Sequence, residues 1–215
     1  MKTLLCLWLL VCGARLALAA GVVHVVCEDD KQQRVADAVA WLVRADGVTP
    51  APQPPPAPVT IQQLGQEFDP YVTPVQVGTR ISFPNQDSVQ HHVYSLSKAK
   101  RFELPLYRGE AREAVVFDQP GIVTLGCNIH DWMIAYVVVL PTPHFAKSGA
   151  DGTAILSNLP AGRYTLEVWH PRLAATVARE IVIAGADAAP QIIRLTLKPD
   201  RRIRRAPEAG GGAYR

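Results

Sequence analysis

The chain has 215 residues, 48% of them hydrophobic and 19% charged, which is typical of a globular protein. Its formal charge of +3 comes from the two ends. Lys2 and Arg15 lie in the N-terminal segment, and the C-terminal tail contains five arginines and two acidic residues. The part of the chain between these ends has a formal net charge near −2. A nucleic-acid-binding surface is therefore not expected.

The first 19 residues have the pattern of a cleavable secretion signal. Lys2 is followed by an apolar run, Leu4–Val11, and by the cleavage pattern Ala17-Leu18-Ala19. The run is shorter than the ~20 residues that span a bilayer, so we expect no transmembrane segment after cleavage. We accordingly expect a bacterial protein of the periplasm, with residues 1–19 removed as a signal peptide.

Two cysteines remain after the expected cleavage, Cys27 and Cys127. In an oxidising compartment two thiols can pair in only one way, so a disulfide between them is one structural alternative. The other is that Cys127 is a metal ligand and Cys27 is a separate core residue.

The early part of the chain predicts strands over residues 22–26 and 38–43. Residues 47–58 are rich in proline and predict a stiff, extended linker. Two strands cannot bury a core by themselves, so these need partners from elsewhere in the chain. No long amphipathic helical pattern follows, and the predicted fold class is all-β.

The chemically distinctive stretch is Gly126–Met133, which reads Gly-Cys-Asn-Ile-His-Asp-Trp-Met. It offers a thiolate at Cys127, an imidazole at His130 and a thioether at Met133, each separated from the next by two residues. Strand-like apolar runs precede and follow it, which predicts a tight loop between two buried strands. Taken singly, each of the three could be an ordinary core or capping residue.

A thiolate, an imidazole and a thioether together suit copper better than zinc, calcium or magnesium. A second imidazole would complete a trigonal site of two histidines and one cysteine with an axial methionine. The candidates lie upstream, at His91 and His92. Side chains alternate along a strand, so only one of these two should face the metal.

Two patterns in the chain resemble the cupredoxins of the plastocyanin and amicyanin type. In that family a Gly-x-x-Ile/Val-x-Phe/Trp-x-Asn strand is followed, six residues after its Asn, by a histidine ligand. A Gly-x5-Cys-x2-His step, followed by Met, forms the second half. Here the first pattern starts at Gly78 and lands on His91, and the second runs from Gly121 through Cys127 and His130. The short Cys-x2-His-x2-Met loop is the amicyanin form.

The resemblance covers residues 59–141 and implies a cupredoxin Greek-key β-sandwich. It also implies one type 1 copper, bound by His91, Cys127, His130 and Met133, that cycles between Cu(I) and Cu(II). Such a protein carries single electrons between redox partner proteins, which the sequence does not identify. This ligand set leaves no open position for a substrate, so an enzyme is not expected.

The family also implies contacts around the metal. The backbone N–H of the residue after the first histidine donates to the thiolate, and that residue's side chain ties the two ligand loops together. Here that residue is His92 where the family usually has Asn, which puts the tie in doubt. His130 is expected on an exposed loop as the electron port, with an apolar contact patch formed by Ile129, Trp132 and Pro84.

The C-terminal third resembles carboxypeptidase regulatory-like and transthyretin-like sandwich domains. Those domains carry a D-x-G turn, a strand and then Leu-Pro-x-Gly-x-Tyr; here Asp151-Gly152-Thr153 stands at the turn, and Leu-Pro-x-Gly-x-Tyr starts at Leu159. We expect one small β-sandwich made of residues 21–46 and 144–198, with the cupredoxin-like block inserted. Residues 199–215 are expected to be a disordered basic tail.

Other functions stay open at the level of sequence. The chain could store or deliver copper, or it could be a metal-free structural β-sandwich module. Proteins with such an amicyanin-like segment are loosely labelled methylamine utilization proteins, a label that establishes no pathway. The remaining histidines are expected to be structural, and the protein is expected to be a monomer.

Overall fold

The computed structural model describes residues 20–46, 54–110, 113–185 and 189–200. The described chain contains 17 β-strands and no helix, so the predicted all-β class is confirmed. Accordingly, these residues include no helix long and apolar enough to span a membrane. The expected signal peptide, residues 47–53 of the expected linker and residues 201–215 of the expected tail lie outside the described residues.

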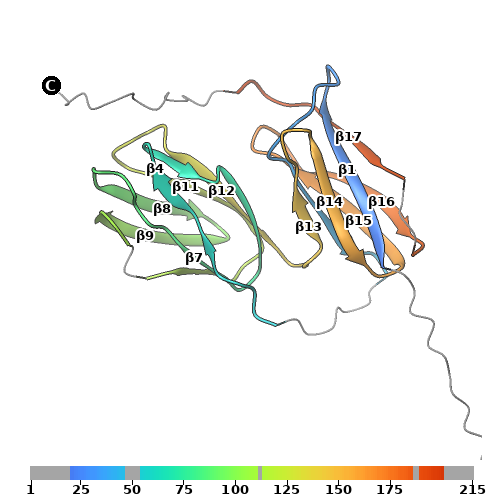
Figure 1. Cartoon of the computed structure of the whole chain (residues 1–215), viewed down its shortest axis with the longest axis horizontal. Helices are drawn as coiled ribbons and strands as arrows, with labels where there is room; N and C mark the ends of the chain where they lie inside the picture. Colours follow the sequence, from blue (N-terminus) through green and yellow to red (C-terminus); the bar gives the residue numbers. More distant parts are fainter. Residues whose placement is uncertain (1–19, 47–53, 111–112, 186–188, 201–215) are drawn as a thin grey trace, which may run out of the picture.

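The middle of the chain forms a β-sandwich of strands β3–β12, here called the central sandwich (Figure 1). One sheet has the strand order β6-β12-β11-β8-β9, the other has the order β10-β7-β3, and β4 and β5 form a separate hairpin. Pairing is antiparallel except between β12 and β6 and between β3 and β7. The strands are β3 (Val59–Thr60), β4 (Gln62–Leu64), β5 (Glu67–Asp69), β6 (Val72–Gln76), β7 (Thr79–Ser82), β8 (His91–Ser97), β9 (Lys100–Tyr107), β10 (Val115–Phe117), β11 (Gly121–Gly126) and β12 (Ile134–Leu140).

The core of the central sandwich lies between its two sheets because side chains alternate along each strand. In β11, Val123 and Leu125 are fully buried, whereas the residue between them is exposed. They pack with Ile81 of the facing sheet. Cys127 and Met133 belong to the same cluster of buried side chains, so the candidate metal loop is continuous with the core.

Strands from both ends of the described chain form a second β-sandwich, here called the flanking sandwich. Its sheets have the orders β14-β1-β17 and β13-β2-β15-β16. All pairs are antiparallel except β1 with β17. The strands are β1 (Gly21–Asp29), β2 (Val39–Arg44), β13 (Phe145–Lys147), β14 (Thr153–Leu159), β15 (Gly162–Trp169), β16 (Val177–Ile183) and β17 (Gln191–Leu195).

A separate core fills the flanking sandwich. In β1 every second residue faces inward, and Val23, Val25 and Cys27 are fully buried. They pack with Leu42 of β2 and Leu166 of β15 from the facing sheet. Because the partners of β1 and β2 follow the central sandwich in the chain, this core depends on both ends of the described sequence.

A third apolar cluster lies between the two sandwiches, whose strands stand side by side in Figure 1. Trp41 of β2 and Trp169 of β15 pack against Val138 and Leu140 of β12, and the ring of Tyr136 meets Trp169 edge to face with centroids 5.5 Å apart. Strands β2 and β12 are therefore buried on both faces. This explains why both read as continuous apolar runs rather than as alternating patterns.

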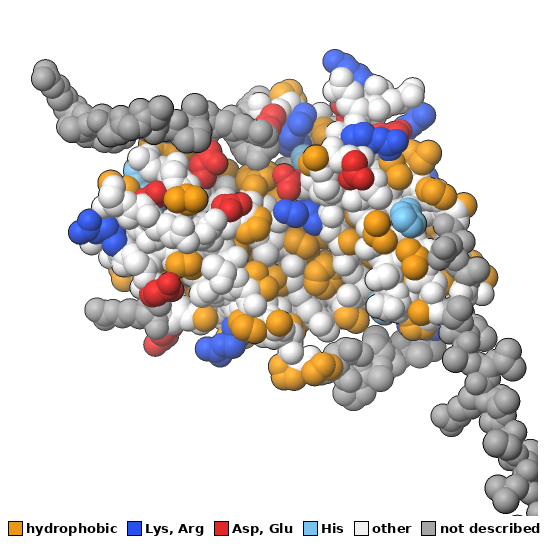
Figure 2. Space-filling model, viewed as in Figure 1, with side chains coloured by type: hydrophobic (Ala, Val, Ile, Leu, Met, Phe, Trp, Pro, Cys, Tyr) orange, Lys and Arg blue, Asp and Glu red, His pale blue; other side chains and the backbone are white. Residues whose placement is uncertain are grey.

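Charged side chains are mixed by sign over the surface. Figure 2 shows lysine and arginine interspersed with aspartate and glutamate over both sandwiches on the face in view. Some form ion pairs, such as Lys100 with Asp118 at 3.1 Å and Lys147 with Asp37 at 3.3 Å. A mixed surface of this kind does not favour a polyanionic partner on that face.

Candidate metal centre

The loop between β11 and β12 carries three of the four predicted ligands, Cys127, His130 and Met133. The two strands are antiparallel neighbours, and their last register pair, Gly126 with Ile134, closes the loop. Within it, the Met133 N–H donates to the His130 carbonyl at 3.0 Å. The loop is thus held at both ends by the sheet and in its middle by its own hydrogen bond.

The upstream histidines lie at the start of β8, next to this loop. Tyr94 of β8 pairs with Gly126 of β11. The register of β8 with β9 shifts between His91 and Val93, and a bulge of this kind redirects side chains. His91 and His92 are consequently both buried, with 0% and 5% of their surfaces exposed. Regular alternation along a strand did not anticipate this.

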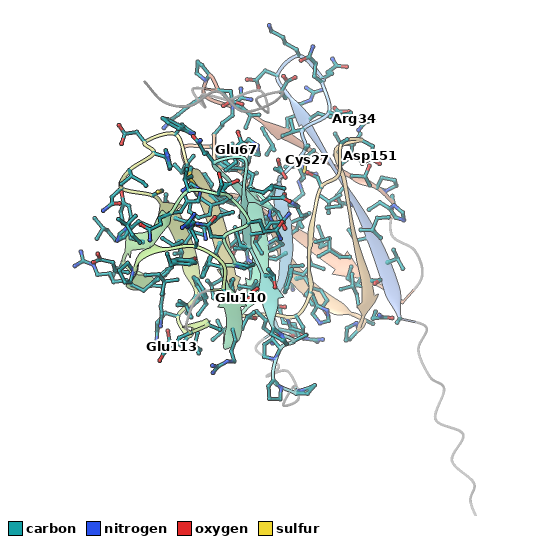
Figure 3. All side chains as sticks on the ribbon, turned by 60° about the vertical axis from the view of Figure 1, so that its left-hand side comes forward. Cys27, Arg34, Glu67, Glu110, Glu113 and Asp151 are labelled. Carbon is teal, nitrogen blue, oxygen red and sulfur yellow. The ribbon has the colours of Figure 1, made fainter. Side chains whose placement is uncertain are left out.

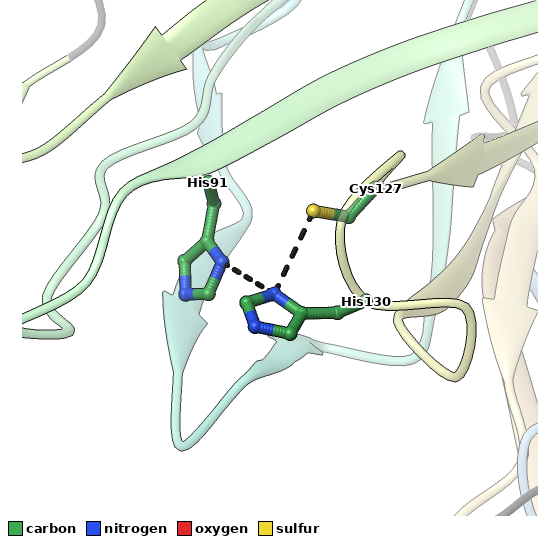
Figure 4. Close-up of side chains that lie close together, drawn as sticks. All are labelled: His91, Cys127 and His130. Atoms are coloured by element: carbon green, nitrogen blue, oxygen red, sulfur yellow. Dashed lines mark hydrogen bonds between the residues drawn. The ribbon is translucent and has the colours of Figure 1, made fainter. Parts of the chain in front are cut away.

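His91, Cys127 and His130 come together in the protein (Figure 4). Their possible ligand atoms all lie within 4.8 Å of one another. The Nδ1 atoms of the two histidines are 3.1 Å apart, and His130 Nδ1 is 3.8 Å from the Cys127 Sγ. One ion bonded at about 2.0–2.1 Å to nitrogen and about 2.3 Å to sulfur can bridge both separations, so the residues fit a shared metal.

Met133, the fourth predicted ligand, is a buried core residue. Only 2% of its surface is exposed, and it packs in the core cluster that also contains Cys127. Met133 lies three residues after His130, so its thioether is on the same loop as Cys127 and His130. A long, weak axial contact is the role that a thioether takes in copper sites of this donor set.

The environment of Cys127 favours a thiolate. Burial by itself raises the pKa of the thiol, but hydrogen bonds outweigh it and hold the pKa below its ordinary value. They come from the His91 side chain and from the backbone N–H groups of His92, Ile129 and His130. The N–H contact from the residue after the first histidine, expected from the family resemblance, is thus present.

Asp87 supports His91 from behind and was not among the predicted residues. Its Oδ2 lies 2.7 Å from His91 Nε2, and its two oxygens accept backbone hydrogen bonds from Gly65 and Gln66. Burial lowers the pKa of His91, but hydrogen bonds with Cys127 and Asp87 outweigh this and raise it. Burial likewise raises the pKa of Asp87, and its hydrogen bonds reverse the direction. A carboxylate four residues before a candidate ligand was the available sequence signal.

His92 does not tie the two ligand loops together through its side chain. Its Nε2 instead lies 2.8 Å from Glu103 Oε1 on the neighbouring strand β9. Its Nδ1 is buried and forms no hydrogen bond within the described structure. The side chain of His92 therefore bonds to strand β9 and not to the ligand loop.

His130 is less accessible than expected. Only 8% of its surface is exposed, and its ring contacts the rings of Trp132 and His91 at centroid distances of 5.1 and 4.9 Å. The exposed member of the expected apolar patch is Ile129, with 49% of its surface exposed. Trp132 and Pro84 are half-buried.

Cys27 lies in the flanking sandwich, not in the central sandwich that contains this group. Both cysteines are free thiols, which overturns the disulfide alternative, and they belong to the cores of different sandwiches. Figure 3 shows Cys27 beside Arg34 and Asp151 in the flanking sandwich. Of the remaining histidines, His170 accepts a hydrogen bond at its Nδ1 from the backbone N–H two residues on.

No family model and no curated protein matches the chain. Among the solved structures that match, the novel purple cupredoxin from Nitrosopumilus maritimus is 24% identical with a TM-score of 0.35, covering 38% of this chain and 99% of that one. The copper-containing nitrite reductase from Thermus scotoductus is 26% identical with a TM-score of 0.37, and the match covers 46% of this chain and 25% of that one. A reduced mutant of amicyanin is 20% identical with a TM-score of 0.34, and the match covers 38% of this chain and 80% of that one. Each of these three matches covers less than half of this chain.

Proposed function

We propose that this protein is a one-electron carrier that binds one type 1 copper through His91, Cys127, His130 and Met133. The observation that carries the proposal is the convergence of two imidazole Nδ1 atoms and one cysteine sulfur in a buried group, with distances of 3.1 and 3.8 Å between them. The thioether of Met133 stands on the same loop, at the spacing of the amicyanin form.

Copper is the metal that this donor set favours. Structural zinc sites are usually tetrahedral with four strong ligands from cysteine and histidine, whereas two histidines, one cysteine and a weak thioether are the donors of blue-copper sites. Calcium and magnesium need oxygen ligands, and the group found here consists of two histidines and a cysteine. Bound here, copper supplies a one-electron couple between Cu(I) and Cu(II).

The residues of the chain contribute rigidity and exclusion of water. The ligand loop is closed by the β11–β12 register, and His91 is fixed by the sheet and by Asp87, so the donors keep their positions. Backbone N–H groups on the Cys127 sulfur stabilise its negative charge. A frame that does not rearrange when the charge of the centre changes favours fast electron transfer.

Electron exchange is proposed to take place at the His130 side of the loop. The imidazole of His130 is nearly buried, yet its neighbour Ile129 is half exposed and Trp132 covers the ring. A redox partner protein that docks on this loop would reach the metal ligand through one layer of side chains. We place the protein in the periplasm because of the secretion pattern of residues 1–19.

The first test is a visible absorption titration of the purified protein with Cu(II). We expect stoichiometric binding and an intense thiolate-to-copper charge-transfer band, because the cysteine sulfur is one of the donors. Cys127→Ser should abolish the band. Cys27→Ser is the matched control and should keep it, since Cys27 lies in the other core.

Two outcomes would contradict the electron-carrier proposal. Copper bound without an intense band and released readily to a chelator would indicate storage or delivery. A colourless protein with no stoichiometric copper would leave a structural β-sandwich protein.

A further inference from the structure

We propose that Asp87 is a positioning residue that fixes the ring and the tautomer of His91 before any metal arrives. This deepens the proposed function, and it rests on that function only in taking the group of His91, Cys127 and His130 as a metal site. The role concerns the metal-free protein, in which it can be tested directly.

The Asp87 carboxylate is held firmly enough for this role. Its Oδ1 accepts the Gly65 N–H at 2.7 Å, and its Oδ2 accepts the Gln66 N–H at 2.8 Å while it contacts His91 Nε2 at 2.7 Å. Only 13% of the Asp87 side chain is exposed. Because the first two donors belong to the turn of the β4–β5 hairpin, the Asp87 carboxylate links this hairpin directly to His91.

Asn85 fixes the same loop from its other side. Its Oδ1 accepts the Asp87 N–H at 2.9 Å, and its Nδ2 donates to the carbonyl groups of Val89 and Tyr107 at 2.9 and 2.8 Å. Asn85 is itself buried, with 4% of its surface exposed. Asn85 thus holds the backbone of Asp87, and the Asp87 side chain cannot turn away from His91 without breaking its hydrogen bonds to Gly65 and Gln66.

The chemistry of these contacts determines where the His91 proton lies. An ionised carboxylate only accepts hydrogen bonds, so the Nε2 atom that faces Asp87 must carry hydrogen. In the neutral ring, Nδ1 is then left as a lone pair. While the His91 ring is neutral, the 3.1 Å contact between the two Nδ1 atoms takes its hydrogen from His130; a hydrogen bond from His91 to the Cys127 sulfur requires the imidazolium form, in which both ring nitrogens carry hydrogen. His91 is thereby presented in the form that binds a metal through Nδ1.

The neighbouring pair of His92 and Glu103 provides a control for the pair of His91 and Asp87. Glu103 Oε1 lies 2.8 Å from His92 Nε2, which is almost the same contact. However, 71% of the Glu103 side chain is exposed, and His92 is not in the metal-binding group. A change at Glu103 therefore alters an equivalent carboxylate–histidine pair without touching a ligand.

The experiment compares the full chain with Asp87→Asn and Glu103→Gln. Nitrogen-15 NMR of the histidine rings in the metal-free protein, at a pH where the ring is neutral, should show His91 protonated on Nε2 and not on Nδ1 in the wild type. In Asp87→Asn the amide NH₂ can face the ring and donate to Nε2, so the His91 population should shift toward protonation on Nδ1. Copper affinity should fall about 10–100-fold in Asp87→Asn, the usual cost of losing such a support, and stay unchanged in Glu103→Gln.

The outcomes separate this inference from the proposed function. A wild-type protein that binds no copper but shows the His91 shift in Asp87→Asn would contradict the electron-carrier role and support the positioning role. A blue-copper band in both proteins, with equal affinity and an unchanged His91 tautomer, would overturn the positioning role alone. Should Asp87→Asn not fold, the wild-type spectrum decides: hydrogen on His91 Nδ1 overturns the inference, and hydrogen on Nε2 supports it.

Discussion

The two described cysteines show how hydrogen bonding and burial compete around one type of side chain. Both are almost completely buried, yet burial raises the pKa of Cys27 to about 11, whereas the pKa of Cys127 lies below its ordinary value. The difference lies in the donors. Cys127 receives hydrogen bonds from the His91 side chain and from three backbone N–H groups, so the loop backbone as well as the histidine prepares the sulfur for a metal.

Cys27 gives a prediction about stability at alkaline pH. Its folded pKa of about 11 is above the ordinary value of 9.0, so the folded state favours the neutral thiol. That contribution is fully present below pH 9 and is lost as the pH rises from 9 to about 11. Urea unfolding across this range should show a loss of stability that is smaller in Cys27→Ala. Equal slopes in both proteins would contradict the prediction.

Spacing in the sequence was sufficient to select the four candidate ligands but not their supports. Cys127, His130 and Met133 lie on one short loop, and counting from the Asn85 pattern pointed to His91. Asp87 and the β8 bulge could not be predicted in the same way. The role of Asp87 depends on its hydrogen bonds with the β4–β5 turn, and the bulge depends on how β8 pairs with β9. These contacts join segments that are separate in the sequence, so no local pattern predicts them.

At the scale of elements, the predictable strands are those with an apolar pattern. The strand predicted at residues 22–26 lies within β1, and the strand predicted at residues 38–43 matches β2 to within one residue at each end. Strand β9 and the β4–β5 hairpin were not predicted. β9 is an edge strand that contains a proline and has no fully buried residue, and the hairpin strands have three residues each. Such strands form because their neighbours supply hydrogen-bond partners.

The turn before β14 provides a test at this scale. Gly152 has a φ of +72°, and a Cβ added there would lie 2.8 Å from the Cys27 carbonyl oxygen. Gly152→Ala should therefore cost roughly 1–3 kcal/mol for the backbone conformation, plus the cost of moving β1. Chemical denaturation measures it. Gly109→Ala is the control, because its φ is +74° but nothing lies within 4 Å of the added atom. Equal losses in the two variants would show that the contact with β1 is unimportant.

At the scale of the molecule, the cluster between the sandwiches makes them cooperate. Its members come from β2 and β15 on one side and from β6 and β12 on the other, so the strand that leaves the candidate metal loop also supports the flanking sandwich. A change at this contact should consequently be felt in both sandwiches.

Trp41→Ala tests this coupling. Trp41 is 93% buried between the sandwiches. Replacing it should lower the free energy of unfolding by about 3–5 kcal/mol, the usual cost of truncating a large buried side chain. Leu96→Ala, at a residue with 71% of its surface exposed, should change it by less than about 0.5 kcal/mol. A loss near that of Leu96→Ala would mean that the sandwiches are energetically independent.

The placement of β1 and β2 has a consequence for the order of assembly during synthesis. Both emerge from the ribosome before the central sandwich, but their sheet partners β13–β17 come after it. All strands of the central sandwich, by contrast, pair with one another within residues 59–140. The central sandwich is thus the first unit whose contacts can be completed, while β1 and β2 wait with unpaired edges. Chain termination before β13 would leave the central sandwich with all of its strands and deprive β1 and β2 of every strand that they pair with in the sheets.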